Sequence, residues 1–76
     1  MDDNIVLTLQ QWRGLRGYSK VDLAKKSGVT ERTIWSFEKD VENLNNANYR
    51  TIKKLATALE IRVDNIFLDD TSEKPN

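Results

Sequence analysis

The sequence contains no cysteine and no histidine, and these absences exclude several classes of function. A chain of 76 residues without cysteine has no disulfide framework, which excludes the small secreted proteins that depend on one. The usual ligands of zinc, haem and iron–sulfur clusters are missing too, so we expect no metal site and no cofactor. Without the cysteine nucleophile and the imidazole base, we also expect no catalytic residues and no enzymatic activity.

Long apolar runs are missing as well. The longest extend over three residues, at positions 5–7 and 66–68, which is too short for a transmembrane helix or a secretory signal. We therefore expect a cytoplasmic protein that does not associate with membranes. Apolar residues make up 38% of the chain, which is enough for one small core and hence for a single domain.

Neither sign of charge is in excess, since twelve basic residues balance twelve acidic ones. The charges are nevertheless distributed unevenly. Residues 10–39 hold seven basic and three acidic residues, a net charge of +4, whereas residues 40–76 hold five basic and seven acidic ones, a net charge of −2. A basic segment followed by an acidic one suits a protein that places one face on a polyanion.

Apolar residues recur at helical spacing, and no alternating strand pattern exceeds four residues. The spacing predicts five helices: about 5–15, 19–27, a third after the cap Thr30, a fourth from the cap Asn48 to Leu59, and about 64–68. Residues 40–47 are expected to form a loop because their asparagines favour turns. Residues 69–76 are polar and acidic and are expected to form a disordered tail. The expected core consists of Leu9, Trp12, Leu23, Ile34, Phe37, Ile52, Leu55, Leu59, Ile61 and Phe67.

Residues 19–39 have the pattern of a helix-turn-helix. Ser19 and Asp22 form an S-x-x-D capping box at the start of one helix, and Thr30 can cap the next. Gly28 between them supplies the positive φ angle of a tight turn, and Val29 fills the corner. Two short helices joined in this way leave the outer face of the second free to enter the major groove of DNA.

Several short motifs occur together in the order and spacing of a known family. They are L-x-x-W-R and R-G-Y-S-K near the start, L-A-K-K-S-G-V-T and T-I-W-x-F-E-K in the middle, and T-I-x-K-L-A-x-A-L-x-I toward the end. Over about residues 5–68 the chain resembles the phage repressor, Cro and xenobiotic-response-element (XRE) family of helix-turn-helix regulators. In two departures from the family pattern, Lys20 stands where glutamine is most frequent, and residues 40–47 contain no lysine or arginine.

The resemblance implies an all-α fold, a compact five-helix domain like that of lambda repressor, which would span residues 1–68. It implies that the protein binds double-stranded operator DNA as a homodimer and regulates transcription. Such a regulator would act as a repressor of a phage, mobile-element or bacterial operon, and DNA binding would place it at the nucleoid.

The resemblance also implies which side chains meet DNA. Base contacts are expected on the exposed front of the third helix, at Glu31, Arg32, Thr33 and Ser36. Phosphate contacts are expected near the helix N-termini and at the end of the third helix, at Ser19, Lys20, Thr30 and Lys39. Arg32 is the strongest candidate for a base contact, because a guanidinium can form paired hydrogen bonds with guanine.

An ion pair between Arg13 and Glu38 is implied in the same way. Arg13 lies on the inward stripe of the first helix, where a lone buried guanidinium is costly. A bidentate bridge to Glu38 would satisfy both groups and tie the third helix to the body of the domain. Of the two tryptophans, Trp12 is expected in the core, and for Trp35 packing is favoured over stacking on DNA.

A second interpretation belongs to another class of function. The protein could be an antitoxin, which neutralises a partner toxin and binds DNA only to autoregulate its operon. The acidic C-terminal half and the long loop at residues 40–47 favour this interpretation. An enzyme is a distant third, because 76 residues in five helices leave little room for a pocket.

Overall fold

The chain folds into short helices joined by tight connections. The computed structural model describes residues 5–68. In chain order it contains α1 (Leu9–Arg16), α2 (Lys20–Ser27), α3 (Glu31–Lys39), α4 (Val41–Asn45), α5 (Tyr49–Leu59) and a 3₁₀ turn, η1 (Val63–Asn65). The all-α class is confirmed, although the five α-helices are not the five that the sequence predicts. The predicted tail, residues 69–76, lies outside the described residues.

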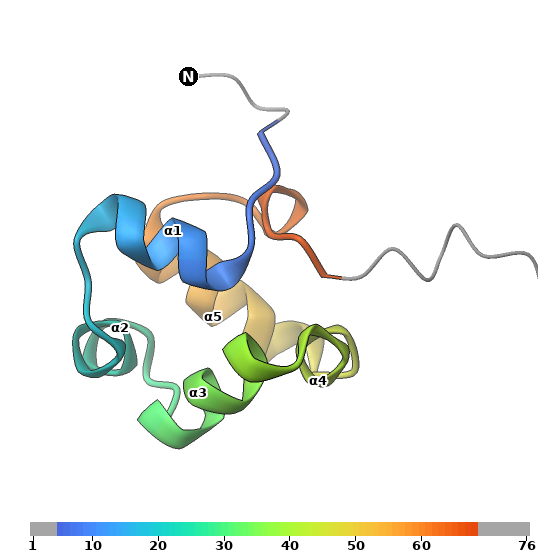
Figure 1. The fold of residues 1–76 in the computed structure, drawn as a ribbon, viewed down its shortest axis with the longest axis horizontal. Helices are drawn as coiled ribbons and strands as arrows, with labels where there is room; N and C mark the ends of the chain where they lie inside the picture. The colour runs from blue at the N-terminus through green and yellow to red at the C-terminus, as the bar shows by residue number, and fades with distance from the viewer. Residues whose placement is uncertain (1–4, 69–76) are drawn as a thin grey trace, which may run out of the picture.

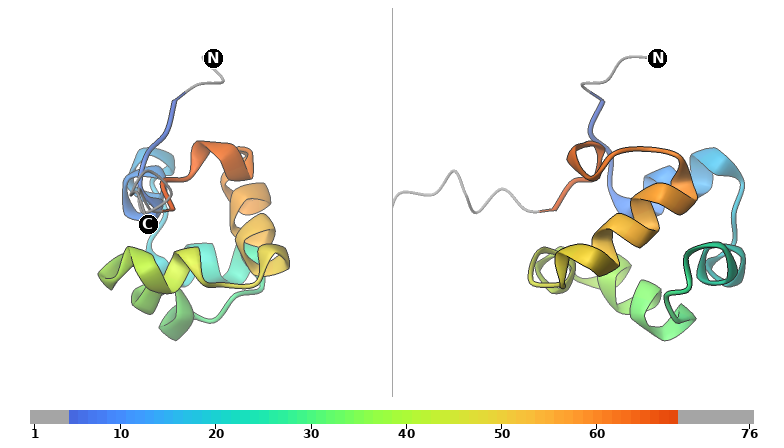
Figure 2. Two further views of the ribbon diagram at one scale, coloured as in Figure 1. Left: turned by 90° about the vertical axis from the view of Figure 1, so that its right-hand side faces the viewer. Right: turned by 180° about the vertical axis from the view of Figure 1, so that it is seen from behind.

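The helices are arranged around α5. In Figure 1 α5 runs behind α1, and the rear view in Figure 2 shows it crossing the molecule from the side of α4 to the far end of α1. α5 packs against α1 and α2, while α3 packs against α1, α2 and α4. α3 lies at the lower edge in Figure 1, with no helix below it. The third helix is thus supported from inside the molecule and uncovered on its outer side.

The first helix begins later than predicted, at Leu9 rather than near residue 5. The Thr8 hydroxyl accepts a hydrogen bond from the Gln11 amide, and the Gln11 side chain accepts one from the Thr8 amide. This capping box fixes the helix start. The preceding residues are extended because Leu7 pairs with the C-terminal segment, donating to Asn65 O at 3.0 Å and accepting from Phe67 N at 2.7 Å.

The prediction of a last helix at about 64–68 is also wrong, because this segment pairs with Leu7. Only the single turn η1 forms, and Ile66 then joins the parallel bridge to Leu7. Asn65 consolidates this join, because its side chain donates to Ile5 O at 2.8 Å and accepts from Arg62 N at 3.0 Å. The two ends of the described chain are therefore held side by side (Figure 2).

The predicted loop at residues 40–47 is also wrong, since it contains α4. Asp40 caps this helix by accepting a hydrogen bond from the Glu42 amide at 3.0 Å. Leu44, which the sequence places in a loop, is only 1% exposed and belongs to the core. Asparagine is a weak helix former, but the burial of one leucine against α3 outweighs that preference over so short a segment.

The core largely matches the predicted set. Eight of the ten predicted residues are buried, and the exceptions, Ile61 and Phe67, are half-buried. Ile66 is buried in place of Phe67 because neighbouring side chains of an extended segment point to opposite faces. The core also contains Val29, Leu44 and Ala56, which the sequence analysis did not include. Trp12 is buried as predicted, and its indole Nε1 donates to Asn65 O at 2.7 Å.

Candidate nucleic-acid interface

The α2–turn–α3 unit is built as the sequence predicts. Ser19 accepts a hydrogen bond from the Asp22 amide, and the Asp22 carboxylate accepts one from the Ser19 amide, each at 3.0 Å. These bonds to the ionised form hold the pKa of Asp22 below its usual value. At the other end of α2, Gly28 has a φ of 79°, and its amide donates to Ala24 O. Val29 is buried in the corner that follows.

α3 therefore has one face in the core and the other in solvent. Ile34 and Phe37 are buried, and Thr30 caps the helix by accepting from the Thr33 amide at 3.1 Å. Glu31 and Arg32 are exposed at its first turn. Neither side chain forms a hydrogen bond or an ion pair with another residue of the described chain. Both are accessible to a ligand that approaches α3 from outside.

The two hydroxyl residues predicted to contact bases are already engaged. Thr33 and Ser36 are half-buried. The Thr30 hydroxyl donates to the Thr33 hydroxyl at 2.8 Å, and Asn43 of α4 donates through its side chain to the Ser36 hydroxyl at 2.9 Å. In each case the acceptor's own hydrogen remains free to bond elsewhere. Asn43 was missed in the sequence analysis, because its approach to α3 depends on α4.

The predicted phosphate-binding residues lie around this face. Ser19 and Thr30 are exposed N-caps of α2 and α3, where backbone amides favour anions. Lys20 is half-buried, with Nζ 3.9 Å from a carboxylate oxygen of Glu38. Lys39 is exposed at the C-terminal end of α3. The structure thus places Ser19, Lys20 and Thr30 near helix N-termini and Lys39 at the opposite end of α3.

The environment of Trp35 differs from the packed one that the sequence favours. It is 51% exposed, so it is not a packed residue. Lys39 Nζ lies 4.8 Å from the centre of its ring, at the distance of a cation–π contact. Lys39 follows Trp35 by four residues, and side chains at that spacing are neighbours on a helix. This pairing could have been read from the sequence, and it adds a flat aromatic surface to the exposed side of α3.

Arg13 and Glu38 form a bidentate ion pair beneath the interface. Arg13 Nε lies 2.7 Å from Glu38 Oε2, and Nη2 lies 3.0 Å from Oε1. Nη1 also donates to Tyr18 O at 2.9 Å. The side chains are only 14% and 6% exposed, and the hydrogen bonds to Glu38 raise the pKa of Arg13 further. The bridge connects α1 to the end of α3, so it fixes the orientation of α3 on the body of the domain.

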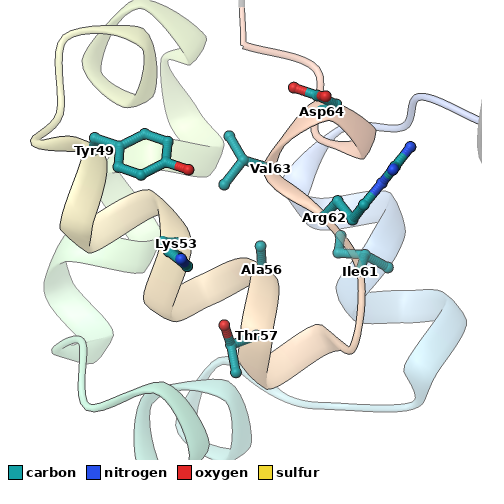
Figure 3. A pocket seen from close by; sticks show the side chains of 8 residues that line it. All are labelled: Tyr49, Lys53, Ala56, Thr57, Ile61, Arg62, Val63 and Asp64. Carbon is teal, nitrogen blue, oxygen red and sulfur yellow. The ribbon is translucent and has the colours of Figure 1, made fainter.

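A shallow pocket of about 340 Å³ lies elsewhere, between α5 and η1. Figure 3 shows the Tyr49 ring facing Val63, with Ala56 of α5 below Val63. None of the predicted DNA-contacting residues lines it. Within residues 5–68 there is no cluster of three or more carboxylates that could hold a metal ion. The same range contains no helix long and apolar enough to cross a membrane.

Comparison with known proteins identifies the family. A family model described as helix-turn-helix matches residues 9–66, which is more than half of the chain. No curated protein and no solved structure gives a match. The matched range contains both helices of the α2–turn–α3 unit, the buried bridge below it and the supporting helix α5. The chain therefore belongs to the XRE-type helix-turn-helix family of DNA-binding transcriptional regulators.

Proposed function

We propose that this protein is a repressor that inserts α3 into the major groove of its operator. The observation that carries this proposal is the exposed first turn of α3, where Arg32 and Glu31 have no partner among residues 5–68. An arginine in this position can bind guanine O6 and N7 through two hydrogen bonds. Glu31 can accept a hydrogen bond from cytosine N4. Bound in this way, the protein would occlude a promoter that overlaps the operator.

The remaining proposed contacts would fix the position of the protein along the DNA and add to its affinity. Thr33 and Ser36 would donate their free hydroxyl hydrogens to bases, and Ser19 and Thr30 would hold phosphates at the helix N-termini. Lys20 and Lys39 would supply the charge that neutralises phosphates on either side of α3. In this proposal the bridge between Arg13 and Glu38 contacts no DNA and only orients the helix that does.

The test is a mobility-shift titration with DNA from upstream of the protein's own gene, against a random duplex of the same length. Specific binding is expected to exceed random binding by about a thousandfold or more at physiological salt. A reporter placed behind the bound sequence then distinguishes repression from activation. Equal affinity for both duplexes would contradict operator recognition, and a reporter that rises with protein would contradict the repressor role.

We propose further that two copies bind one operator through the face between α5 and η1. Tyr49 is 63% exposed beside the pocket there, and Val63 lies across from it (Figure 3). Arg62 and Asp64 on the same face carry opposite charges, so a two-fold contact between identical surfaces can pair each with the other. The pairing is expected on DNA rather than in free solution, because an operator with two half-sites holds the two copies next to each other.

Sedimentation analysis of the protein with a single operator duplex measures this pairing. Two chains per duplex are expected, and Tyr49→Ala is expected to weaken binding of the second chain by about fivefold or more. Leu15→Ala is the matched control, because Leu15 on α1 has nearly the same exposure, 64%. Equal effects of the two substitutions, or one chain per duplex, would contradict the proposed dimer.

The antitoxin interpretation stays a prediction without new support. One of its two motivating features, the long loop, is α4 in the structure, held by buried Leu44. The other feature, the acidic C-terminal half, includes three basic residues of α5 that the fold brings next to α2. Co-purification with the product of a neighbouring gene would test this interpretation directly.

A further inference from the structure

A second basic surface lies apart from α3. The neighbouring helices α2 and α5 leave a groove of about 400 Å³ between them. Lys26 lines it from α2, and Arg50, Lys53 and Lys54 line it from α5. None of the residues predicted to contact DNA is among those that line this groove.

The four cations of this groove gather on one surface without ion pairs. Within residues 5–68 none of them forms an ion pair, which is also true of most other basic side chains there. Lys26 lies 5.1 Å from the ring centre of Tyr18, which fixes its position without neutralising its charge. The pKa of Asp22, one turn before Lys26 on α2, is lowered mainly by its hydrogen bonds with Ser19 and to a lesser degree by the charges of Lys25 and Lys26, and Asp22 forms no ion pair with Lys26. Four cations on one surface without an ion pair favour an anionic ligand.

The lining of the groove favours a protein ligand over DNA. Thr57 and half-buried Ala58 lie among the cations and contribute methyl groups, together with the methylene chains of the lysines. A phosphate group has no apolar part, whereas a peptide carries apolar and acidic side chains together. Complementarity of charge with an apolar centre is typical of protein–protein contacts.

We infer that the groove between α2 and α5 docks an acidic segment of another protein, one that presents carboxylates on either side of an apolar side chain. The carboxylates bind Lys26 across the groove from Lys53 and Lys54, and the apolar side chain rests on Ala58. The site is separate from the proposed DNA contacts, so a partner bound there can be recruited to the operator. This adds a protein-recruiting surface to the DNA-binding function.

The test uses the full chain, labelled with ¹⁵N, and a short synthetic helical peptide with glutamates and leucines on one face. Amide shifts are expected at Lys26, Lys53 and Ala58. Replacing the glutamates of the peptide by glutamines, or its leucines by serines, is expected to weaken binding. Lys54→Glu should weaken it by about fivefold or more, and Lys25→Glu by less than about twofold, although each changes the net charge equally.

Lys25 is the matched control because it is exposed on α2 and does not line the groove. Equal losses in the two variants would overturn the proposal in favour of general electrostatic attraction. Shifts that move to α3 when the peptide is added would also overturn it. If Lys54→Glu instead weakened binding of a random DNA duplex, the groove would be a phosphate site. If removal of residues 69–76 shifted the same amides, the occupant would be this chain's own acidic segment.

Discussion

At the scale of single residues, Arg32 and Lys39 are expected to contribute to DNA binding in different ways. Arg32 is exposed at the start of α3 and can read a base, whereas Lys39 stacks over Trp35 at its end and can only meet phosphate. Arg32→Ala should weaken operator binding by about 1–3 kcal/mol and relax the sequence preference. Lys39→Ala should weaken operator and random DNA alike. Competition titrations with both duplexes measure the difference, and an equal loss in both for Arg32→Ala would contradict base recognition.

Asp22 provides a pH-dependent contribution to stability. Hydrogen bonds from Ser19 lower the pKa of its carboxyl in the folded state below the value of about 3.9 that a free aspartate has. Because the folded pKa is the lower one, this stabilisation is fully present above about pH 4 and is lost as the pH falls through the folded pKa. Asp22→Asn should remove that part of the acid dependence. Urea midpoints measured between neutral and acidic pH check this, and parallel curves for both proteins would contradict it.

At the scale of elements, the bridge between Arg13 and Glu38 controls how α3 is presented. Glu38→Gln removes a nearly buried charge and leaves the Arg13 guanidinium without a carboxylate, which should cost about 3–5 kcal/mol of unfolding free energy. Operator affinity should fall as well, although neither side chain is proposed to touch DNA. Lys20→Ala is the control for stability, because its longer contact of 3.9 Å is one-third exposed and worth about 1 kcal/mol or less. A Glu38→Gln variant with unchanged stability and affinity would contradict the positioning role.

The short helix α4 depends on Leu44. Its side chain is 1% exposed, and α4 carries Asn43, which bonds to Ser36 on α3. Leu44→Ala should cost about 2–5 kcal/mol through lost burial and the cavity left behind. Leu15→Ala, at 64% exposure, should change stability by about 0.5 kcal/mol or less. Equal denaturation midpoints for the two variants would mean that residues 40–47 behave as the loop that the sequence predicts.

The elements that the sequence predicts correctly are those defined by local signals. The capping box of Ser19 and Asp22, the turn at Gly28 and the periodic apolar face of α5 depend on residues within a few positions of each other. The bridge between Leu7 and Ile66 joins residues at opposite ends of the chain, and local propensity cannot predict such a partner. α4 is missed because the burial of Leu44 against the rest of the fold outweighs the turn preference of its asparagines. The start of α1 is different, because the capping box of Thr8 and Gln11 is a local signal that the sequence does contain.

The features of the candidate site also divide into those that local sequence signals predict and those that they do not. Exposure of Glu31 and Arg32 follows from helical periodicity once Ile34 and Phe37 are placed in the core. The contact between Asn43 and Ser36 requires α4 and could not be predicted from spacing. The pairing of Lys39 with Trp35 follows from their spacing, because side chains four residues apart are neighbours on a helix. For Trp35, however, the sequence analysis considered only core packing and stacking on DNA.

At the scale of the whole molecule, the charge segments of the sequence are rearranged by the fold. Residues 40–76 are acidic in sum, yet Arg50, Lys53 and Lys54 from that segment lie beside Lys26 in the groove between α2 and α5. The described residues 5–68 hold eleven basic and seven acidic residues, and the balancing acids belong to the rest of the chain. A net charge of zero therefore does not describe the surface that DNA would meet.

This distribution leads to a prediction for the salt dependence of operator binding. Two phosphate-binding cations are proposed per chain, Lys20 and Lys39, so a bound dimer neutralises four phosphates through them. At about −0.9 per phosphate, the logarithm of affinity should fall with the logarithm of salt concentration with a slope of about −3.6. Lys39→Ala should make that slope shallower by about one for each chain bound, whereas Lys54→Glu should leave it unchanged. Fluorescence anisotropy across a salt series measures the slope for the wild-type protein and for each of the two variants. If the four cations between α2 and α5 also contacted phosphate, a dimer would neutralise twelve phosphates and the wild-type slope would be about −11. A slope that steep, or one that changes with Lys54→Glu, would contradict the assignment of that groove to a protein partner.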